Sequence, residues 1–514
     1  MNTEFYRMTE GPEAPDAGRI LARAGEIIRA GGLVAFPTET VYGLGADAFN
    51  GEAVKHIFEA KGRPADNPLI VHISDLSQVK YIADMSPLER ERFETLGAAY
   101  WPGPLTMIVT KNKKIPDEVT CGLSTVGIRM PSNPVAAAFI SEAGVPIAAP
   151  SANSSGRPSP TLAEHVREDM DGKVDAIIDG GPCEVGLEST VIDLTGEVPM
   201  ILRPGGITLE AVRKVLPDAE QLGWKGPAET GEKPRSPGLK YRHYAPKAKT
   251  VLLQGTPEKV AKCMENALDF AFRRGVAARA LASGETAALI SRPESVSVLG
   301  SREDGSAQAA NLFKMLREFD DLGVAEVYAE AMPDDGVGFA VMNRLYRAAG
   351  CNLAPVRKTL FVCTGNTCRS FMAEFIYRHI LQKKIAAGQL EAASELVSSA
   401  GLYASEGGAG SAMAGEVLKL EYGVDGSGHR TRPFYHDDGD SADRIVAMTQ
   451  GHKRILLAQY PEFAEKTFTL GELAGHPEED VEDPFAGSYS TYSRCAEQIE
   501  RLVKEFLIPE LSAH

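Results

Sequence analysis

Residues 358–370 read KTLFVCTGNTCRS, in which an apolar run leads through a glycine-containing loop into a helical pattern. The run 358–362 predicts a buried strand, and the helical pattern starts near Ser370. Successive N–H groups in a loop of this kind converge on an anion, and the helix N-terminus adds the positive end of its dipole. The stretch therefore predicts a strand, an anion-binding loop and a helix, which begin an α/β unit.

Five residues separate Cys363 from Arg369 in this loop. The positive field of the loop favours a thiolate, so Cys363 would be able to attack phosphorus, and Arg369 offers a bidentate fork to the phosphate oxygens. Far downstream, Asp483 in a turn-prone loop is the predicted general acid, and later the base for water. Taken alone, the pair also fits a buried structural cysteine, which stays the alternative at this point.

Further segments extend the pattern: residues 372–374 read MAE, residues 399–401 read SAG, and residues 483–485 read DPF. Together with the loop they resemble the low-molecular-weight protein tyrosine phosphatase family. The resemblance implies a cysteinyl-phosphate on Cys363, phosphate binding by Arg369, support of the thiolate by Ser370 and acid catalysis by Asp483. It implies no metal and no cofactor for this reaction on a phosphorylated protein substrate.

Within that family, Thr367 in the loop and Phe485 after Asp-Pro are more similar to the bacterial protein-arginine phosphatases. The Thr367 hydroxyl could orient the attack on a planar guanidinium phosphate, so phosphoarginine and phosphotyrosine both stay open as substrates. Phe371 stands where the family has proline, a residue that presets the first helical turn.

The first part of the chain shows a second α/β pattern, because apolar runs at 32–36, 69–73, 105–109 and 191–194 alternate with helical stretches. Five short motifs accompany it: PTETVYGLG at 37–45, KGRP at 61–64, NPL at 67–69, PSAN at 150–153 and ESTV at 188–191. Hydroxyl-rich turns, the Lys-Gly-Arg step and Arg129 supply positive charge and N–H donors for a polyphosphate. The basic residues also fit a solvated face.

These motifs in this order resemble the YrdC/Sua5 family, and the run SPGLKYRHYAP at 236–246 with the α/β pattern behind it resembles the longer Sua5 branch. The family condenses L-threonine, bicarbonate and ATP, the last with Mg²⁺, into threonylcarbamoyl-AMP and pyrophosphate. The product serves threonylcarbamoyladenosine formation in tRNA, so the resemblance implies hand-over to a tRNA-modifying transferase complex.

Motif positions carry the family's site residues onto this chain. The resemblance implies that L-threonine is surrounded by Thr40, His72, Arg129, Ser151 and Ser189. It implies that the nucleotide is faced by Lys61, Arg63, Asn67, Thr125, Asn153, Thr161, Arg203 and Tyr244.

Four segments are expected: a YrdC-like synthase domain over 1–205, a linker or lid over 206–248, a Sua5 C-terminal domain over 249–350 and a phosphatase domain over 357–514. The linker could fold over the cleft or act as a passive hinge. Strands of the third segment are expected at 251–253, 287–290 and 324–328. Asn343 and Arg344 in its last helix fit packing as much as chemistry, and no catalytic role is assigned to them.

The expected fold class is α/β throughout. It comprises a YrdC-like twisted sheet, a small Sua5-type α/β domain, and a phosphatase domain whose central parallel sheet is flanked by helices.

Composition limits the class of protein. A chain of 514 residues is too long to fold around a single hydrophobic core, so several domains are expected. The net charge of −16 argues against a protein whose main role is nonspecific nucleic-acid binding. Seven scattered cysteines favour a reducing compartment, and the sequence shows no secretory pattern and no run of eighteen apolar residues, so a cytoplasmic protein without membrane contact is expected.

Two functions are weighed on these observations. A bifunctional synthase and phosphatase explains both motif sets. The alternative is an RNA-binding YrdC-type module with a regulatory phosphatase domain, against which the acidic charge and the lack of basic runs with interleaved aromatics count.

Overall fold

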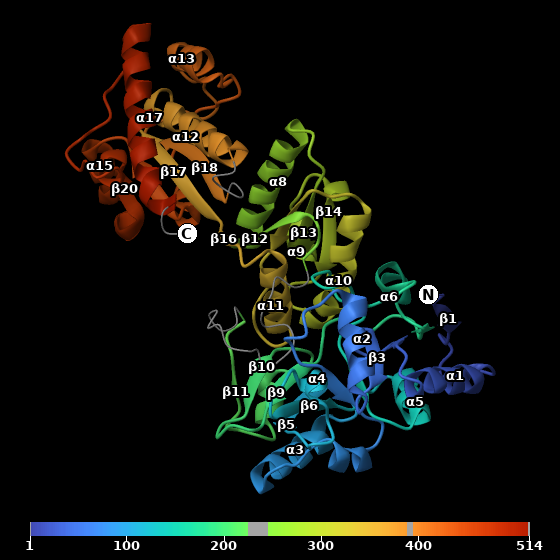
Figure 1. Ribbon diagram of the computed structural model, residues 1–514. Coiled ribbons are helices and arrows are strands. Elements are labelled where there is room, and N and C mark those ends of the chain that lie inside the picture. The colour runs from blue at the N-terminus through green and yellow to red at the C-terminus, as the bar shows by residue number, and fades with distance from the viewer. Residues whose placement is uncertain (1, 225–244, 388–393, 512–514) are drawn as a thin grey trace. The chain divides into compact units, whose positions relative to one another are not determined.

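The computed structural model describes residues 2–224, 245–387 and 394–511 (Figure 1). They form three sheets, each with its own helices, which confirms the α/β fold class. The chain divides into two compact units, Met1–Leu252 with Ala271–Ala288 and Arg292–Leu353, and Leu253–Phe270 with Leu289–Ser291 and Ala354–His514.

The first sheet has eleven strands in the order β1-β8-β2-β3-β7-β4-β6-β5-β9-β10-β11. It is mixed, since β4 pairs with β6 in parallel and with β7 antiparallel. Its strands are β1 (Glu4–Arg7), β2 (Val34–Phe36), β3 (Gly43–Asp47), β4 (Ile70–His72), β5 (Leu105–Thr110), β6 (Thr125–Arg129), β7 (Ile147–Ala149), β8 (Ala176–Asp179), β9 (Thr190–Asp193), β10 (Met200–Arg203) and β11 (Glu220–Gln221).

Helices cover this sheet and define its loops. They are α1 (Ala17–Arg29), α2 (Gly51–Lys61), the 3₁₀ helix η1 (Leu76–Tyr81), α3 (Pro87–Tyr100), α4 (Asp117–Thr120), α5 (Pro134–Ala143), α6 (Ala163–Met170) and α7 (Leu209–Arg213). Helix α2 begins after Asn50, whose side chain accepts hydrogen bonds from two backbone N–H groups, and ends at Gly62 with φ +60°. The chain therefore leaves the helix at Gly62, between Lys61 and Arg63.

Within the predicted linker 206–248, helix α7 and strand β11 lie in its first part, and residues 225–244 lie outside the described residues. Strand β11 pairs in parallel with β10 at the edge of the large sheet.

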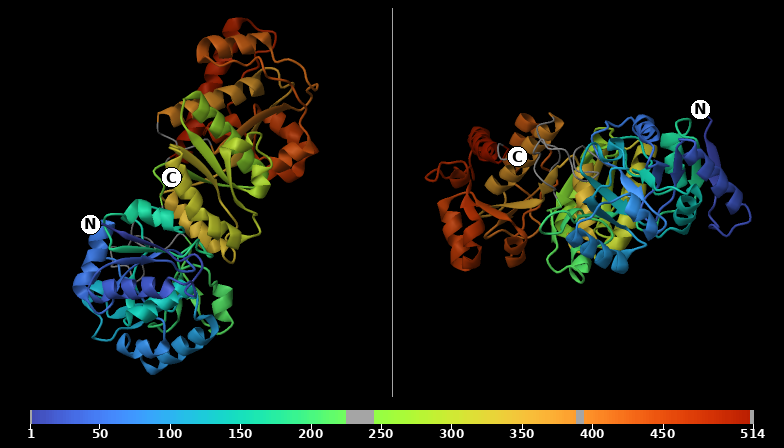
Figure 2. Two further views of the ribbon diagram at one scale, coloured as in Figure 1. Left: turned by 90° about the vertical axis from the view of Figure 1, so that its right-hand side faces the viewer. Right: turned by 60° about the horizontal axis from the view of Figure 1, so that its bottom comes forward.

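The second sheet has five strands in the order β14-β13-β15-β12-β16, and they run side by side in the yellow-green segment of Figure 2. They are β12 (Lys249–Gln254), β13 (Ala278–Ser283), β14 (Val296–Gly300), β15 (Glu326–Glu330) and β16 (Leu353–Pro355). The accompanying helices are α8 (Pro257–Arg273), α9 (Gly284–Ala287), the 3₁₀ helix η2 (Pro293–Ser295), α10 (Gly305–Asp321) and α11 (Gly338–Ala348). The strand predicted at 287–290 is wrong, because α9 ends there and the buried strand is β13.

The third sheet is parallel throughout, in the order β18-β17-β19-β20. Its strands are β17 (Arg357–Cys363), β18 (Glu395–Gly401), β19 (Arg444–Ala447) and β20 (Thr467–Thr469). Its helices are α12 (Arg369–Ala386), α13 (Ala412–Tyr422), α14 (His436–Ser441), α15 (Gln450–Gln459), the 3₁₀ helix η3 (Pro461–Lys466), α16 (Leu470–Leu473) and α17 (Tyr489–Leu511).

Both faces of this third sheet are buried. One core joins Phe361 to α12, α13 and α17, and a second joins Leu360 to Phe463 on the opposite face, as alternation along a strand requires. Figure 1 shows α12 and α17 beside each other over β17. The central parallel sheet flanked by helices is therefore confirmed.

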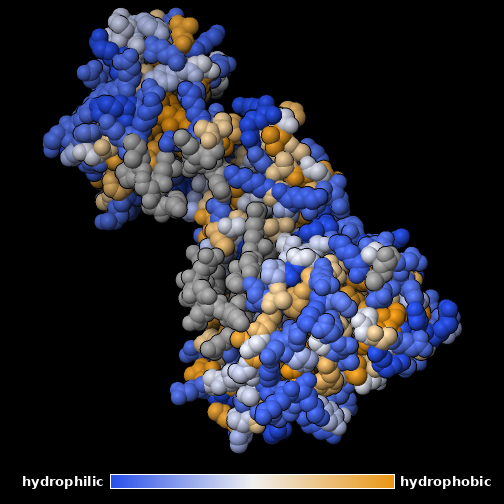
Figure 3. All heavy atoms as spheres, in the orientation of Figure 1, coloured by the Kyte–Doolittle hydropathy of each residue, from blue (hydrophilic) through white to orange (hydrophobic). Residues whose placement is uncertain are grey.

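Hydrophilic residues cover most of the face visible in Figure 3, and hydrophobic ones are scattered among them. Among the described helices, none combines the length and the apolar character needed to cross a bilayer.

Candidate active sites

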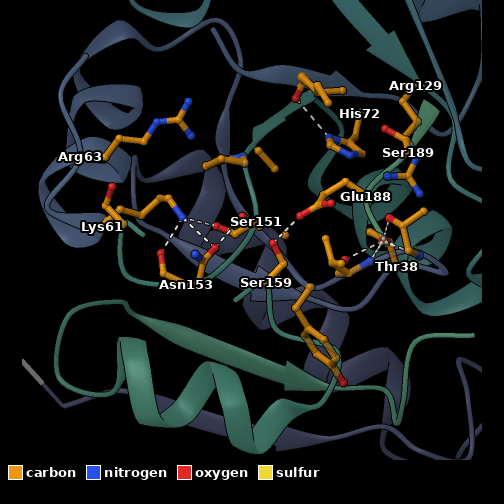
Figure 4. Close-up of a pocket in the computed structure, with 18 of the residues that line it drawn as sticks. Thr38, Lys61, Arg63, His72, Arg129, Ser151, Asn153, Ser159, Glu188 and Ser189 are labelled. Atoms are coloured by element: carbon orange, nitrogen blue, oxygen red, sulfur yellow. Dashed lines mark hydrogen bonds between the residues drawn. The ribbon is translucent and has the colours of Figure 1, made fainter. Parts of the chain in front are cut away.

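A pocket in the first unit collects side chains from the loops around β2, β7 and β9 and from the end of α2 (Figure 4). Its lining residues are Thr38, Thr40, Val41, Tyr42, Gly43, Lys61, Arg63, Ile70, His72, Arg129, Ala149, Pro150, Ser151, Asn153, Ser155, Gly156, Arg157, Ser159, Glu188, Ser189 and Arg203. All five residues predicted around threonine are among them, as are Lys61, Arg63, Asn153 and Arg203 of the predicted nucleotide set.

Lys61 lies at one end of the pocket, beside Arg63 (Figure 4). Its buried Nζ donates to the carbonyl oxygens of Ser151 and Asn153, the latter at 2.5 Å. Burial, followed by the charge of Arg63, holds the pKa of Lys61 well below its ordinary value. A bound polyphosphate would offset both effects, so this end of the pocket is suited to an anion.

His72 and Arg129 lie at the opposite end, together with Ser189 (Figure 4). They are register partners on the adjacent parallel strands β4 and β6. Burial, followed by the charge of Arg129, lowers the pKa of His72 to about 3, so the imidazole is neutral at pH 7. The Arg129 guanidinium forms a buried ion pair with Glu39, at 2.7 Å between Nη2 and Oε1.

Ser189 is fixed between two neighbours. Its hydroxyl lies 2.8 Å from the Thr106 hydroxyl, and Arg203 on β10 donates to both the Ser189 carbonyl and its Oγ at 3.1 Å. Ser189 therefore presents its hydroxyl to the pocket in a single, hydrogen-bonded arrangement.

Glu188 and Ser159 were missed by the sequence analysis. Among the described lining residues Glu188 is the single carboxylate, and its Oε1 accepts a hydrogen bond from Ser159 Oγ. The motif ESTV at 188–191 contains Glu188 and could have pointed to it. Mg²⁺ prefers several carboxylate, phosphate and water oxygens, so this lining is suited to a metal ion that arrives with a nucleotide rather than to a protein-built metal cage.

Four predicted nucleotide residues are not part of this lining. Asn67 is buried and its carbonyl accepts from Arg63 Nη2 at 3.1 Å. Thr125 lines a smaller neighbouring pocket, and the backbone N–H of Thr161 donates to His165 Nδ1 at 3.3 Å. Tyr244 lies outside the described residues.

The second site is the loop between β17 and α12. Cys363 ends the strand, and its Sγ accepts from the backbone N–H of Asn366 at 3.3 Å and lies 3.0 Å from Ser370 Oγ. Asn366 adopts a left-handed conformation with φ +56°, and its side-chain amide donates to Ser370 and Ser399. One N–H of the loop thus points at the sulfur, where the sequence predicts an anion-binding loop.

Arg369 is the first residue of α12, and its Nη2 donates to Asp483 Oδ2 at 2.9 Å. The Arg369 side chain is 9% exposed, whereas that of Asp483 is 55% exposed. The structure therefore brings the predicted general acid to the predicted phosphate-binding arginine, a contact that the sequence could not show. Thr367, the remaining predicted residue, is half-buried in the same loop, with Oγ1 3.4 Å from Cys368 Sγ.

Phe371 packs against the loop through His429. Its ring stacks on His429, with centroids 4.2 Å apart, and His429 Nε2 lies 2.8 Å from the Asn366 carbonyl oxygen. Glycines at 410 and 426 provide the space, since a Cβ at either would lie within 2.8 Å of the Phe371 ring. The aromatic ring at this position is thus accommodated by the packing around it.

His452, on α15, was also missed by the sequence analysis. Its Nε2 lies 2.8 Å from Thr364 Oγ1 in the loop, and its Nδ1 lies 2.9 Å from Thr449 Oγ1. Burial, followed by the charge of Arg369, lowers the pKa of His452 to about 4.

Comparison with family models divides the chain into three matches. Residues 26–205 match the Sua5/YciO/YrdC model described as telomere recombination. Residues 207–350 match the model of the threonylcarbamoyl-AMP synthase C-terminal domain, and residues 358–514 match the model of low molecular weight phosphotyrosine protein phosphatase.

Curated relatives cover the first two matches. Threonylcarbamoyl-AMP synthase of Bacillus subtilis is 48% identical over 331 residues, which are 64% of this chain and 93% of the relative. The enzyme of the same name from Pyrococcus abyssi is 46% identical over 336 residues, or 65% and 95% of the two chains. The crystal structure of P. abyssi Sua5 complexed with L-threonine is 42% identical, has a TM-score of 0.63, and is covered completely by 70% of this chain.

Proposed function

The chain belongs to the threonylcarbamoyl-AMP synthase family and carries a low-molecular-weight phosphatase domain, and from this premise we propose that it is a bifunctional enzyme. One site would form threonylcarbamoyl-AMP from L-threonine, bicarbonate and ATP. The other would hydrolyse phosphoarginine or phosphotyrosine in proteins through a cysteinyl-phosphate.

The observation that carries the synthase proposal is the division of one pocket into two ends (Figure 4). Lys61 and Arg63 would bind the nucleotide phosphates, with Mg²⁺ on those phosphates. Arg129 and Ser189 would hold the carboxylate of L-threonine, the ligand in the P. abyssi Sua5 structure. Thr40, His72 and Ser151 would also contact threonine, and Asn153 and Arg203 would contact the nucleotide. Ser151, whose carbonyl accepts from Lys61, and Arg203, which donates to Ser189, would do so where the two groups of residues adjoin.

The reaction has two steps, carbamate formation at the threonine end and adenylate formation at the nucleotide end. The threonine amine loses a proton and attacks the bicarbonate carbon, water is lost, and a carbamate oxygen then attacks the α-phosphorus of ATP. The bond to pyrophosphate breaks, and cations at the phosphate end stabilise the charge that develops on it. Neutral His72 contributes hydrogen bonding without adding a second charge beside Arg129.

The synthase is tested with the purified full-length chain, ATP, Mg²⁺, bicarbonate and labelled L-threonine. Pyrophosphate and the labelled adenylate should form together, and omission of any one substrate should stop both. Pyrophosphate release that does not depend on threonine would refute the proposal. We further propose that the adenylate passes to a tRNA-modifying transferase complex.

For the phosphatase, the carrying observation is the Cys363 sulfur held by loop hydrogen bonds beside Arg369 and Asp483. Cys363 Sγ would attack phosphorus while Arg369 binds the equatorial oxygens and Ser370 supports the thiolate. Asp483 would protonate the leaving group, and would then take a proton from the water that hydrolyses the S–P bond.

Substrate preference would depend on Thr367, whose hydroxyl could hydrogen-bond a guanidinium N–H of phosphoarginine. The test compares hydrolysis of phosphoarginine and phosphotyrosine by the native chain and by Thr367→Val, which keeps the side-chain shape. A loss confined to phosphoarginine supports the assignment, and an equal loss on both substrates contradicts it.

We also propose the domain boundaries 1–205, 206–248, 249–350 and 357–514. Limited proteolysis that cuts within 206–248 and near 351–356 before it cuts elsewhere would support them.

A further inference from the structure

Glu188, the pocket carboxylate, is hydrogen-bonded by Arg344 of helix α11, which does not itself line the pocket. Arg344 is fully buried, and its Nε donates to Glu188 Oε2 at 3.1 Å. Its Nη1 donates to the carbonyl oxygen of Pro204 at 2.5 Å. One guanidinium therefore fixes the segment that contains Glu188 and the end of β10 that contains Arg203, and both of these residues line the pocket.

Arg317 of helix α10 makes the corresponding contacts on the other wall. It is 1% exposed, and its Nε and Nη2 donate to the Pro158 carbonyl oxygen at 3.1 and 2.7 Å. Its Nη2 also donates to Asp169 Oδ2 at 2.8 Å, and Asp169 is paired with Arg157 of the pocket lining. The loop on either side of Pro158 is thus held by a helix that follows it by about 150 residues.

A hydrogen bond from Ser159 Oγ to Glu188 Oε1 joins the two walls. Ser159 follows the carbonyl that Arg317 holds, and Glu188 is the carboxylate that Arg344 holds. The contact therefore depends on both arginines. The hydroxyl donates to an ionised carboxylate, so the charge of Glu188 matters to the geometry.

Backbone packing brings the same helices close to the pocket. A Cβ at Gly186 would lie 2.5 Å from the carbonyl oxygen of Ala309 on α10, so this approach requires glycine. The hydrophobic cluster of the five-stranded sheet also includes Val41, which lines the pocket, and Leu187, which precedes Glu188.

We propose that Arg344 and Arg317 are positioning residues of the synthase pocket, through which the C-terminal synthase domain (residues 207–350) sets the shape of a site that none of its described side chains lines. Arg344 acts through Glu188, and Arg317 acts through the Pro158 carbonyl and Asp169. The inference rests on the proposed synthase function and adds the second domain to it. From the sequence, Arg344 fits packing as much as chemistry and has no assigned catalytic role.

The test compares Arg344→Gln with a matched control, Arg302→Gln. Arg302 forms an ion pair with fully buried Glu330 in the same domain, and neither residue lines the pocket. Both substitutions remove one arginine from a buried carboxylate, so both should destabilise the domain. Only Arg344→Gln should lower kcat/KM for L-threonine, by about tenfold or more, because small displacements of binding groups have large effects on rate.

A pH profile separates positioning from loss of stability. The charged groups that face Glu188 are Arg344 of α11, Arg203 of β10 and Lys61 of α2, and against the effect of burial the two arginines hold the pKa of Glu188 below its ordinary value. Removal of Arg344 should raise the pKa of Glu188, so the kcat/KM of Arg344→Gln should increase as the pH is raised. Native protein and Arg302→Gln should show no such increase, and Arg344→Lys, which keeps the charge but not the two-point contact, should remove the pH dependence and restore only part of the rate.

Equal kcat/KM values and parallel pH profiles for folded Arg344→Gln and Arg302→Gln would overturn the proposal. If Arg344→Gln does not fold, Ser159→Ala tests the contact between the walls: a several-fold loss in kcat/KM at unchanged melting temperature supports it, and native kinetics overturn it. Failure of the proposed function is distinct, because the native chain would then show no threonine-dependent pyrophosphate release.

Discussion

Arg369 Nη2 and Asp483 Oδ2 are joined by a hydrogen bond of 2.9 Å across 114 residues of sequence. Arg369 is anchored at the start of α12 with most of its side chain buried, whereas more than half of the Asp483 side chain is exposed. A bound phosphate would take over the arginine donors and leave Asp483 free to reach the leaving-group oxygen. The ion pair thus keeps Asp483 beside the proposed position of the leaving group.

Asp483→Asn should lower kcat for phosphate esters about 10²-fold or more, because the amide cannot donate a proton to the leaving group. The loss should be larger for phenyl phosphate than for p-nitrophenyl phosphate, whose leaving group needs less protonation. Asp480→Asn is the control, since Asp480 is exposed nearby and accepts from the Gln450 backbone. Equal losses on the two esters would contradict acid catalysis by Asp483.

Phe371→Pro should destabilise the phosphatase domain by about 3 kcal/mol rather than improve it, because it removes a buried ring stacked on His429. The backbone itself should tolerate proline, since residue 371 lies in the first turn of α12, where N–H groups have no partner within the helix. Denaturant unfolding measures the change. Phe371→Leu retains volume without the stack and should lose less, and a stabilised proline variant would disprove this account of the packing.

Acidification from pH 6.5 to 5 should destabilise the phosphatase domain in part through His452, whose pKa burial and the charge of Arg369 lower to about 4. The unfolded chain binds this proton below pH 6.5, whereas the folded chain binds it only near pH 4. Stability therefore falls as the pH drops through this window, at up to about 1.4 kcal/mol per pH unit. Chemical unfolding of His452→Gln across this pH window should show a flatter slope than that of the native protein, and an unchanged slope would contradict the assignment.

Lys61→Met should lower kcat/KM for ATP about 10²-fold and leave L-threonine binding within a few-fold of native, because Lys61 lies at the phosphate end of the pocket. The variant should remain folded, since methionine needs no desolvation of a charge in this buried position. Calorimetry with threonine alone measures the second quantity. Loss of threonine binding equal to the loss for ATP would show that the pocket is not divided as proposed.

Local chemistry was predictable from sequence where the groups are close in sequence. Cys363 and Arg369 lie within one loop, and the strand before and the helix after them could be predicted from the apolar pattern. The strand expected at 287–290 was wrong because AALI has an apolar pattern typical of a strand, whereas the actual strand, β13 with the sequence ARALAS, contains three alanines that favour a helix. Burial between β14 and β15 decides its structure.

Contacts between distant residues could not be predicted. Glu188 and Arg344 are separated by 156 residues. No rule of sequence spacing relates a carboxylate in a loop of the first sheet to an arginine on a helix that packs with the second sheet. The same holds for Arg129 and Glu39, whose pairing depends on the register of β4 and β6 and on the turn after β2. Residue types with an evident chemistry were found, and the buried partners that orient them were not.

The central claim is that one chain carries two separate enzymatic sites, and Cys363→Ser in the full-length protein tests it most directly. Threonine-dependent pyrophosphate release and phosphate-ester hydrolysis are measured on the same native and variant preparations. The account predicts that the native protein has both activities, and that the variant keeps the first within twofold and loses the second. Loss of both activities in folded variant protein, or native protein that lacks either one, would contradict it.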